Sequence, residues 1–533
     1  MAYKLMIQGT MSSAGKSFIV TALCRLFSDL GFKVAPFKSQ NMALNSGVTF
    51  DGFEMGRAQI VQAEAARTVP DVRMNPILLK PNSDVGSQVI VMGKPIGNMK
   101  AREYYDYKTS LVPVIKEAFY SLEKEYDVII VEGAGSPAEI NLKDNDIVNM
   151  GLAKMLDIPV LLVGDIDLGG VFAQLLGTLE WLEEDERDRI KGLIINKFRG
   201  DVSLLKPGID MLTERTKKDV VGVVPYAKVS IDEEDSVTID LDKNDNKNQS
   251  ESILNVCVIR LPHLSNFTDF TPLKNVKGVS VNYVDNLEKI KNAKPDLIII
   301  PGTKSTIADM NWLSETGLSR YIIDASKSVP IIGICGGYQM LGVSISDPYN
   351  IESCDSKNNH YNPDDISNKL VDGLSLLSHS TVISSDKTLK KTEGIINNVD
   401  GFFQCLNGCK YEGYEIHCGV SSDGIYDDNN LIEDLIMDSN NNVFGTYIHG
   451  FFDRADVTKS LLKALADRKY KDLKERKDTD DFGARYELFV SKLDDITDYS
   501  DIKEKQYNLA AKMLQEALNI KRVFEIMNIP FKG

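Results

Sequence analysis

Near its start the chain reads Met6-Ile7-Gln8-Gly9-Thr10-Met11-Ser12-Ser13-Ala14-Gly15-Lys16-Ser17, a stretch that indicates the fold class of the part that follows. It comes after an apolar run and before an amphipathic segment, as a phosphate-binding loop does between a strand and a helix. Small residues in such a loop let backbone N–H groups surround phosphates, while a lysine adds positive charge and a hydroxyl reaches Mg2+. The stretch therefore predicts a site for a nucleoside triphosphate.

The loop is one residue longer than the strict pattern, because five residues separate Gly9 from Gly15. This lengthened form is similar to the loop of dethiobiotin-synthetase-like enzymes. The alternative, a Gly/Ser turn that only joins a strand to a helix, is disfavoured by Gly-Lys-Ser in this context. We expect ATP to be bound by Gly9, Thr10, Ser13, Gly15, Lys16 and Ser17.

Length and composition exclude several classes of protein. With 533 residues, of which 43% are hydrophobic and 26% charged, the chain can form two or more domains with full cores. Its net charge of -16 argues against nucleic acid or an anionic membrane surface as the main partner. Neither a membrane-spanning run nor a signal peptide is visible, and the seven cysteines lack disulfide-framework spacing. We therefore expect a cytoplasmic protein with reduced thiols.

Short β-rich runs alternate with helical stretches along most of the chain. This alternation predicts an α/β fold of two domains, each with a mainly parallel sheet flanked by helices and with ligands at the carboxyl ends of the strands. The expected strands are Lys4–Gln8, Lys33–Phe37, Val128–Glu132, Val160–Gly164 and Gly192–Asn196, then Leu254–Arg260, Leu297–Pro301, Ile331–Cys335 and Phe444–His449.

Changes in composition give the expected domain boundaries. Residues 1–228 form the ATP-binding domain, and a polar, charged linker follows at 229–252. A second domain covers 253–458, with an Asn/Asp/Ser-rich surface insertion between Asp347 and Asn368. Residues 459–533 form a helical C-terminal extension, in which Tyr507–Met527 has the spacing of an amphipathic packing helix.

The second domain contains Pro330-Ile331-Ile332-Gly333-Ile334-Cys335-Gly336-Gly337-Tyr338-Gln339-Met340, a strand, then Gly-x-Cys-Gly-Gly, then a helix. This pattern predicts a nucleophile elbow, in which the helix N-terminus favours the Cys335 thiolate and the Gly336 N–H binds an oxyanion. His449 ends an apolar run and is the expected base. A cysteine alone is more often a buried core residue, but the flanking glycines favour a nucleophile.

Further stretches in both domains carry a resemblance to a known family. They are Val34-Ala35-Pro36-Phe37-Lys38-Ser39-Gln40-Asn41-Met42-Ala43-Leu44-Asn45-Ser46, Asp51-Gly52-Phe53-Glu54-Met55-Gly56-Arg57-Ala58-Gln59, Asn75-Pro76-Ile77-Leu78-Leu79-Lys80-Pro81, Glu132-Gly133-Ala134-Gly135-Ser136-Pro137-Ala138-Glu139-Ile140-Asn141 and Gly413-Tyr414-Glu415-Ile416-His417. With them the whole chain resembles the cobyric acid synthase family of glutamine-dependent amidases.

The resemblance implies a dethiobiotin-synthetase-like amide synthetase domain followed by a class I glutamine amidotransferase-like domain. The partners would be glutamine and a corrin, and the cofactors ATP and Mg2+. ATP would activate the b, d, e and g carboxylates of adenosylcobyrinic acid a,c-diamide as acyl phosphates. Ammonia from glutamine would then convert them to amides and give adenosylcobyric acid.

The resemblance also assigns roles in the second domain. Cys335 would attack the glutamine amide and His449 would protonate the departing ammonia, with oxyanion donors at Gly336 and at Gly302 in Pro301-Gly302-Thr303-Lys304. The wider class I amidotransferases have a glutamate two residues after the base, where this chain has Phe451. Asp453 is a weak candidate for a third catalytic member.

In the first domain, similarity to dethiobiotin synthetases implies that Ser17, Asp51 and Glu132 hold Mg2+, which prefers carboxylate oxygens. Asp165 and Asp167 are a rival pair, although either could only cap the following helix. Asn196, with Lys197 beside it, falls where related folds contact the adenine base. A turn role for these two residues stays open.

Three cations in the ligand loops, Lys38, Arg57 and Lys80, are expected to bind substrate carboxylates or the acyl phosphate, although a single Lys or Arg is more often a solvated surface residue. A zinc site is disfavoured, because the Cys-x3-Cys spacing is unusual for zinc. The residues considered for it are Cys405, Cys409, His417 and Cys418.

Two other functions are alternatives for a chain with this pattern. Cobyrinic acid a,c-diamide synthase shares the architecture, but Gln40-Asn41-Met42-Ala43-Leu44-Asn45-Ser46 favours the cobyric acid branch. A partition-type ATPase switch uses a second lysine early in the loop, where this chain has Thr10 and Met11. The order of amidations, the ammonia route and the oligomeric state stay open.

Overall fold

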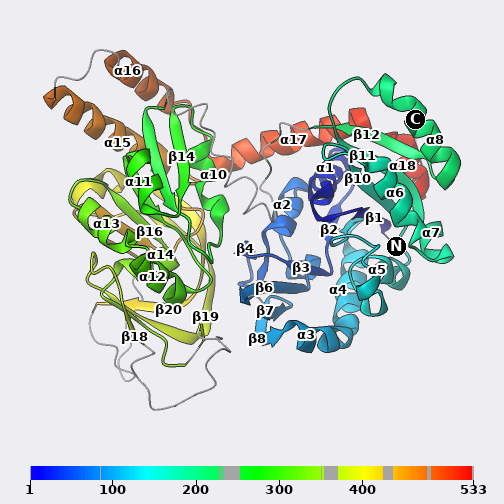
Figure 1. Ribbon diagram of the computed structural model, residues 1–533, viewed down its shortest axis with the longest axis horizontal. Helices are drawn as coiled ribbons and strands as arrows, with labels where there is room; N and C mark the ends of the chain where they lie inside the picture. Colours follow the sequence, from blue (N-terminus) through cyan, green and yellow to red (C-terminus); the bar gives the residue numbers. More distant parts are fainter. Residues whose placement is uncertain are drawn as a thin grey trace. The chain divides into compact units, whose positions relative to one another are not determined.

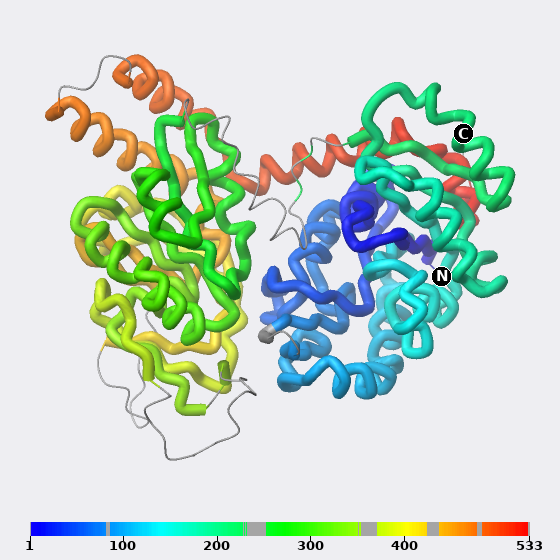
Figure 2. Tube along the Cα trace, in the orientation of Figure 1, coloured from blue at the N-terminus to red at the C-terminus, as the bar shows by residue number. Residues whose placement is uncertain are grey.

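The computed structural model describes residues 2–83, 86–226, 229, 231, 252–349, 351–352, 370–423, 436–476 and 482–530. The chain divides into two compact units, Met1–Pro81 with Val85–Glu234 and Ile502–Gly533, and Asn82–Asp84 with Asp235–Asp501 (Figures 1 and 2). Each unit is an α/β structure with a mainly parallel central sheet, so the predicted fold class is confirmed.

The central sheet of the first unit is parallel throughout, in the order β12-β11-β10-β1-β9-β2. The strands expected in this part of the chain all form. Their bounds are β1 Tyr3–Gly9, β2 Val34–Phe37, β9 Val128–Glu132, β10 Val160–Asp165, β11 Ile190–Phe198 and β12 Val220–Pro225.

Both faces of this sheet are buried, because successive residues of a strand point to opposite sides. In β9, Ile129 and Val131 join the core on one face and Val128 and Ile130 join the core on the other. The main helices of the unit are α1 Lys16–Asp29, α2 Arg57–Ala65, α4 Val112–Glu125, α5 Met150–Leu156, α6 Val171–Glu180 and α8 Lys206–Thr216.

Between β2 and β9 the chain makes a smaller sheet of order β3-β6-β7-β8 and a hairpin of β4 and β5. Glu54 lies in β5 and Lys80 lies in β6. Their bounds are β3 Gln40–Met42, β4 Ser46–Val48, β5 Glu54–Gly56, β6 Ile77–Ser83, β7 Gly86–Val91 and β8 Lys94–Lys100, followed by α3 Ala101–Tyr107.

The second unit has a central sheet of order β14-β13-β15-β16-β22-β21, parallel except for β21, and a second sheet of order β18-β17-β19-β20. All strands expected here form. The central strands are β13 Leu254–Ile259, β14 Val279–Val284, β15 Leu297–Ile300, β16 Ile331–Ile334, β21 Met437–Asn440 and β22 Val443–Thr446. The second sheet has β17 Ser344–Ser346, β18 Leu370–Asp372, β19 Ser380–Ile395 and β20 Lys410–Ser422. Helices include α12 Thr306–Glu315, α13 Leu318–Ala325 and α14 Gly336–Leu341.

The described C-terminal part is helical and is divided between the two units. Its helices are α15 Ala455–Glu475, α16 Phe482–Leu493, α17 Tyr499–Ala517 and α18 Ile520–Ile526. The chain from Ile502 onward packs on α1 through apolar residues such as Leu514 and Phe524, and Phe524 stacks on Phe27 with ring centroids 5.6 Å apart.

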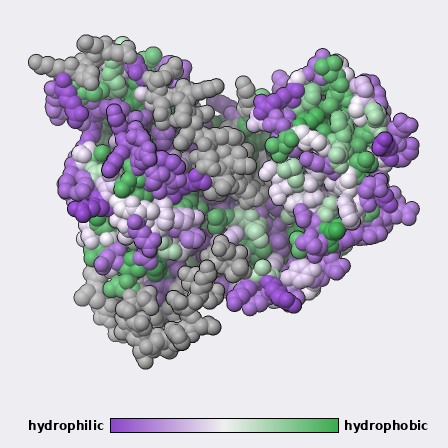
Figure 3. Space-filling model, in the orientation of Figure 1, coloured by the Kyte–Doolittle hydropathy of each residue, from purple (hydrophilic) through white to green (hydrophobic). Residues whose placement is uncertain are grey.

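The tail Tyr507–Met527 is not one helix, because Leu518 bridges to Gly222 of β12 and Asn519 caps α18 through the N–H of Arg522. Most of the expected linker at 229–252 and most of the expected insertion at Asp347–Asn368 lie outside the described residues. On the face drawn in Figure 3, hydrophobic residues are interspersed with hydrophilic ones. No described helix is long and apolar enough to cross a membrane.

Candidate active sites

The phosphate-binding loop joins β1 to α1 through Gly15, whose φ of 94° lies in the left-handed region that favours glycine. A Cβ at this position would lie 2.1 Å from Nδ2 of Asn196, so a side chain has no room here. Asn196 itself donates from Nδ2 to the carbonyl oxygen of Ala14 at 2.9 Å. The structure thus brings Asn196 against the loop, where it holds the turn that begins α1.

The Lys16 side chain curls over the loop. Its Nζ donates to the carbonyl oxygens of Met11, Ser12 and Gly135 at 3.0, 3.1 and 3.0 Å. Ser13 is held from the other side by Lys197, whose Nζ donates to its carbonyl oxygen at 2.8 Å. The N–H of Thr10 donates to the carbonyl oxygen of Val163 in β10, so the loop is anchored to the ends of the neighbouring strands.

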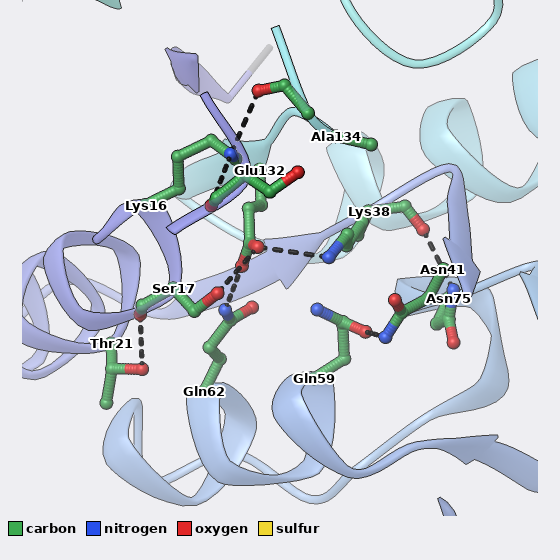
Figure 4. A network of polar contacts seen from close by, with 12 residues as sticks. Lys16, Ser17, Thr21, Lys38, Asn41, Gln59, Gln62, Asn75, Glu132 and Ala134 are labelled. Atoms are coloured by element: carbon green, nitrogen blue, oxygen red, sulfur yellow. Dashed lines mark hydrogen bonds and ion pairs between the residues drawn. The ribbon is translucent and has the colours of Figure 1, made fainter. Parts of the chain in front are cut away.

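Glu132, the last residue of β9, lies directly beside α1 and is 1% exposed (Figure 4). Its carboxylate accepts from the Ser17 hydroxyl at 2.8 Å, from Lys38 Nζ at 3.1 Å and from Gln62 Nε2. Burial works to raise the pKa of Glu132, but the positive charge of Lys38 and the hydrogen bonds outweigh it and hold the pKa below its ordinary value. Glu132 is therefore an anion next to the Ser17 hydroxyl.

A hydroxyl and a carboxylate at a helix N-terminus suit Mg2+ beside phosphates, so Ser17 and Glu132 fit the metal expected from the sequence. Asp51 lies exposed in the turn between β4 and β5, and among the described residues no hydrogen bond or ion pair joins it to either of them. The rival residues are engaged elsewhere: Asp165 pairs with Lys197 at 2.9 Å and Asp167 with Arg199 at 2.8 Å.

The cysteines and histidine weighed for zinc do not come together. Cys409 contacts Ser460, with its sulfur 3.3 Å from the hydroxyl, and Nδ1 of His417 lies 2.7 Å from the carbonyl oxygen of Gly419. In the described part of the chain, no group of three or more His, Cys, Asp or Glu residues is arranged to hold a metal ion.

The cations expected to bind substrate differ in their surroundings. Lys38 lies in the Glu132 network, whereas Lys80 forms a buried ion pair with Glu54 at 3.0 Å and donates to Ser46 at 2.9 Å. Arg57 begins α2 and is half-buried. The structure thus places Lys38 beside the phosphate-binding loop and Lys80 in the core of the β4, β5 and β6 region.

Cys335 occupies a tight turn between β16 and α14, with φ of 52° and ψ of −110°. This strained conformation is typical of a nucleophile elbow. The close packing behind it requires glycine, because a Cβ at Gly337 would lie 2.0 Å from the carbonyl oxygen of Ile300. The Cys335 N–H donates to the carbonyl oxygen of Thr446, which ties the elbow to β22 and hence to the segment that carries His449.

His449 is 1% exposed, and its Nδ1 lies 2.7 Å from Oδ2 of Asp269. The other oxygen of Asp269 accepts from the N–H of Gly450 at 3.0 Å. Burial works against the charged imidazole, but Asp269 and Cys335 outweigh it and raise the pKa of His449 to about 10. Cys335, His449 and Asp269 therefore form one connected set.

The structure places the carboxylate of Asp269 on His449, whereas the sequence offered Asp453 as the third catalytic member. Asp269 lies 180 residues before His449, in the short turn Phe267–Phe270 after β13. Sequence reasoning missed it because no motif or spacing links this polar loop to the histidine.

The segment expected to supply an oxyanion donor, around Gly302, lies beside His449. A Cβ at Gly302 would lie 3.0 Å from Cε1 of His449, and a Cβ at Gly336 would lie 2.6 Å from Cγ2 of Thr303. Gly302 thus lies beside the base, and Gly336 lies beside the segment that carries Gly302.

Comparison with known proteins identifies the family of both domains. Residues 5–239 match the CobQ/CobB/MinD/ParA nucleotide binding domain, and residues 255–457 match the CobB/CobQ-like glutamine amidotransferase domain. The cobyric acid synthase of Ruminiclostridium cellulolyticum is 48% identical over 538 residues, which cover 99% of this chain and 97% of that protein. The chain belongs to the cobyric acid synthase family.

Other members are similarly close. The cobyric acid synthase of Lachnoclostridium phytofermentans is 48% identical over 99% of both chains, and that of Caldanaerobacter subterraneus is 46% identical over 99% of both. These relatives confirm the resemblance drawn from the motifs. As a member of the cobyric acid synthase family, the chain is an enzyme, a glutamine-dependent ligase with a nucleotide-binding domain.

The Asp269→Asn variant tests the arrangement found in this family member. Asparagine keeps the shape of the side chain but cannot stabilise the imidazolium or fix its tautomer, so we expect kcat for glutamine hydrolysis to fall about 100-fold or more. Release of glutamate from glutamine measures the effect. Asp453→Asn is the matched control and is expected to stay within a few-fold of the wild type.

A pH series separates this role from a purely structural one. Because the folded-state pKa of His449 is raised to about 10 from 6.5, its proton stabilises the fold fully below pH 6.5, and this stability is lost as the pH rises through about 10. In Asp269→Asn we expect that dependence of the free energy of unfolding to flatten. An unchanged dependence, measured by denaturant unfolding at several pH values, would contradict the Asp269–His449 assignment.

Proposed function

We propose that this enzyme amidates the b, d, e and g carboxylates of adenosylcobyrinic acid a,c-diamide and releases adenosylcobyric acid, with ATP as the energy source and glutamine as the nitrogen source. The observation that carries the proposal is the presence in one chain of a Cys335–His449–Asp269 set and a phosphate-binding loop beside a buried carboxylate. Full-length relatives named cobyric acid synthase support the choice of substrate.

At the elbow, the thiolate of Cys335 attacks the side-chain amide carbon of glutamine, and N–H groups near Gly336 and Gly302 bind the oxyanion. The imidazolium of His449 gives its proton to the departing nitrogen, which leaves as ammonia. A water molecule, deprotonated by His449, then hydrolyses the glutamyl thioester and regenerates Cys335. Asp269 holds the imidazole in the required orientation and stabilises its charged form.

At the phosphate-binding loop, the N–H groups from Gly9 to Ser17 and the Lys16 ammonium would hold ATP, and Ser17 and Glu132 would hold Mg2+. Bound ATP and Mg2+ supply the phosphoryl transfer that turns a substrate carboxylate into an acyl phosphate. Lys38 lies 3.1 Å from Glu132 and so would place a positive charge where the carboxylate meets the triphosphate.

The choice between corrin substrates is open to a direct test. Adenosylcobyrinic acid a,c-diamide and cobyrinic acid are each incubated with enzyme, ATP, Mg2+ and glutamine, and the products are analysed by mass spectrometry. We expect the diamide to gain amides at its b, d, e and g positions. If only cobyrinic acid reacts and amidation stops at the a and c positions, the enzyme is a cobyrinic acid a,c-diamide synthase.

A further inference from the structure

Helix α2 presents two glutamines to the nucleotide site of the first unit. Gln59 and Gln62 are three residues apart, so they share one face of the helix, and both are 0% exposed. Figure 4 shows their amide groups pointing toward each other and toward the ends of Lys38 and Glu132. Four polar groups thus gather beside Ser17.

Each glutamine is anchored through one end of its amide. Gln62 donates from Nε2 to Glu132, and Gln59 accepts at Oε1 from Nδ2 of Asn41 at 2.9 Å. The other ends, Nε2 of Gln59 and Oε1 of Gln62, are buried and have no hydrogen-bond partner among the described residues. The Glu132 carboxylate fixes the amide orientation of Gln62, and in the structure the pair offers one donor and one acceptor.

A buried polar atom without a partner costs about 1–3 kcal/mol of folding free energy. Two such atoms side by side are therefore unusual for residues that serve only the fold. The unpaired donor of Gln59 and the unpaired acceptor of Gln62 match the hydrogen-bonding needs of the two reactants of amide formation. A carboxylate or acyl phosphate has only acceptor oxygens and needs donors such as Gln59 Nε2 and Lys38. Ammonia carries N–H groups and needs an acceptor, which Gln62 Oε1 provides.

We propose that Gln59 binds an oxygen of the carboxyl group that is being activated and that Gln62 accepts an N–H of the attacking ammonia. In this step the nitrogen lone pair forms the new C–N bond and the C–O bond to phosphate breaks. The leaving phosphate takes the electron pair of that bond and the surplus proton of the nitrogen. Gln62 orients the nucleophile without being protonated. This assignment rests on the proposed function.

Two variants separate the two roles when ammonium chloride is the nitrogen source. Gln59→Glu keeps the acceptor for Asn41 but places a negative charge against the substrate carboxylate, and we expect KM for the corrin to rise at least about tenfold. Gln62→Met removes the acceptor and also the Nε2 donor to Glu132, and we expect KM for ammonium to rise at least about tenfold. Gln88→Glu, a half-buried glutamine on β7, is the matched control.

The dissociation constant for ATP and the thermal midpoint are measured for every variant. For Gln59→Glu we expect an ATP affinity within about threefold of the wild type. If the glutamate destabilises the fold, the uncharged variant Gln59→Met replaces it. Unchanged KM values in folded variants, or a loss of ATP affinity in the Gln59 variants as large as their KM effect, would overturn the proposal. A wild type that amidates no corrin would instead refute the proposed function.

Discussion

The Cys335→Ala variant is expected to lose glutamine-dependent amidation by at least about a thousandfold and to keep ammonium-dependent amidation near the wild-type rate. In the proposed mechanism the sulfur is the atom that attacks glutamine, and no neighbouring group in the described elbow can replace it. Carboxylate activation is proposed to occur in the other unit and would not use this thiol. Product formation with glutamine and with ammonium chloride, measured side by side, gives the ratio.

Cys405→Ala is the matched control for this experiment, because Cys405 lies in the same unit, is half-buried and is far along the chain from the elbow. It should behave as the wild type with both nitrogen sources. If Cys335→Ala lost ammonium-dependent amidation as well, Cys335 would have a structural role and the elbow would not be the glutaminase nucleophile.

The Lys16→Ala variant is expected to lose amidation with both nitrogen sources, by about a thousandfold or more. Removal of the ammonium group takes away the charge that meets the phosphates and also the three hydrogen bonds that hold Met11, Ser12 and Gly135 in the loop. Without phosphoryl transfer the substrate carboxylate has no leaving group, so ammonia from any source cannot react. ADP formation in the presence of the corrin measures the lost step directly.

Lys124→Ala, an exposed lysine on α4, controls for the loss of one positive charge from the same unit. Glutamine hydrolysis by the Cys335 site is expected to survive in Lys16→Ala. Continued amidation by Lys16→Ala would refute activation through an acyl phosphate at this loop.

The parts of the structure that the sequence predicted are those that local patterns determine. The phosphate-binding loop and the elbow each need glycines at fixed positions, because the backbone must turn with φ above zero or pass close to another strand. The strands are short apolar runs buried on both faces, which makes them visible without knowledge of their partners. The fold class and the family therefore followed from the chain alone, whereas the place of the two sites stays a prediction.

Contacts between distant segments were not visible in the same way. Asp269 reaches His449 across 180 residues, and its loop has no pattern that differs from an ordinary polar turn. In the sequence Gln59 and Gln62 resemble ordinary interior residues of a helix. Only the folded structure shows that Glu132, at the end of β9, accepts a hydrogen bond from Gln62. The helical tail was expected, but the break at Leu518 depends on pairing with β12.

Charged residues were the hardest to assign from the sequence. Lys38 and Lys80 were both expected to bind substrate, yet Lys38, which follows β2, meets Glu132 beside the phosphate-binding loop, whereas Lys80, within β6, pairs with Glu54 in a buried cluster. An isolated lysine carries no information on its partner, because its long side chain can reach carboxylates on several elements. Burial and pairing decide its role, and both depend on the folded structure.

Nitrogen released at Cys335 is expected to become the amide nitrogen of the corrin. The most direct measurement supplies glutamine labelled with heavy nitrogen in its side-chain amide, together with ATP, Mg2+ and adenosylcobyrinic acid a,c-diamide, and determines the label in the product by mass spectrometry. We predict that every new amide carries the label and that one glutamate appears for each amide formed. Release of glutamate and ADP while the corrin gains no labelled nitrogen would contradict the account.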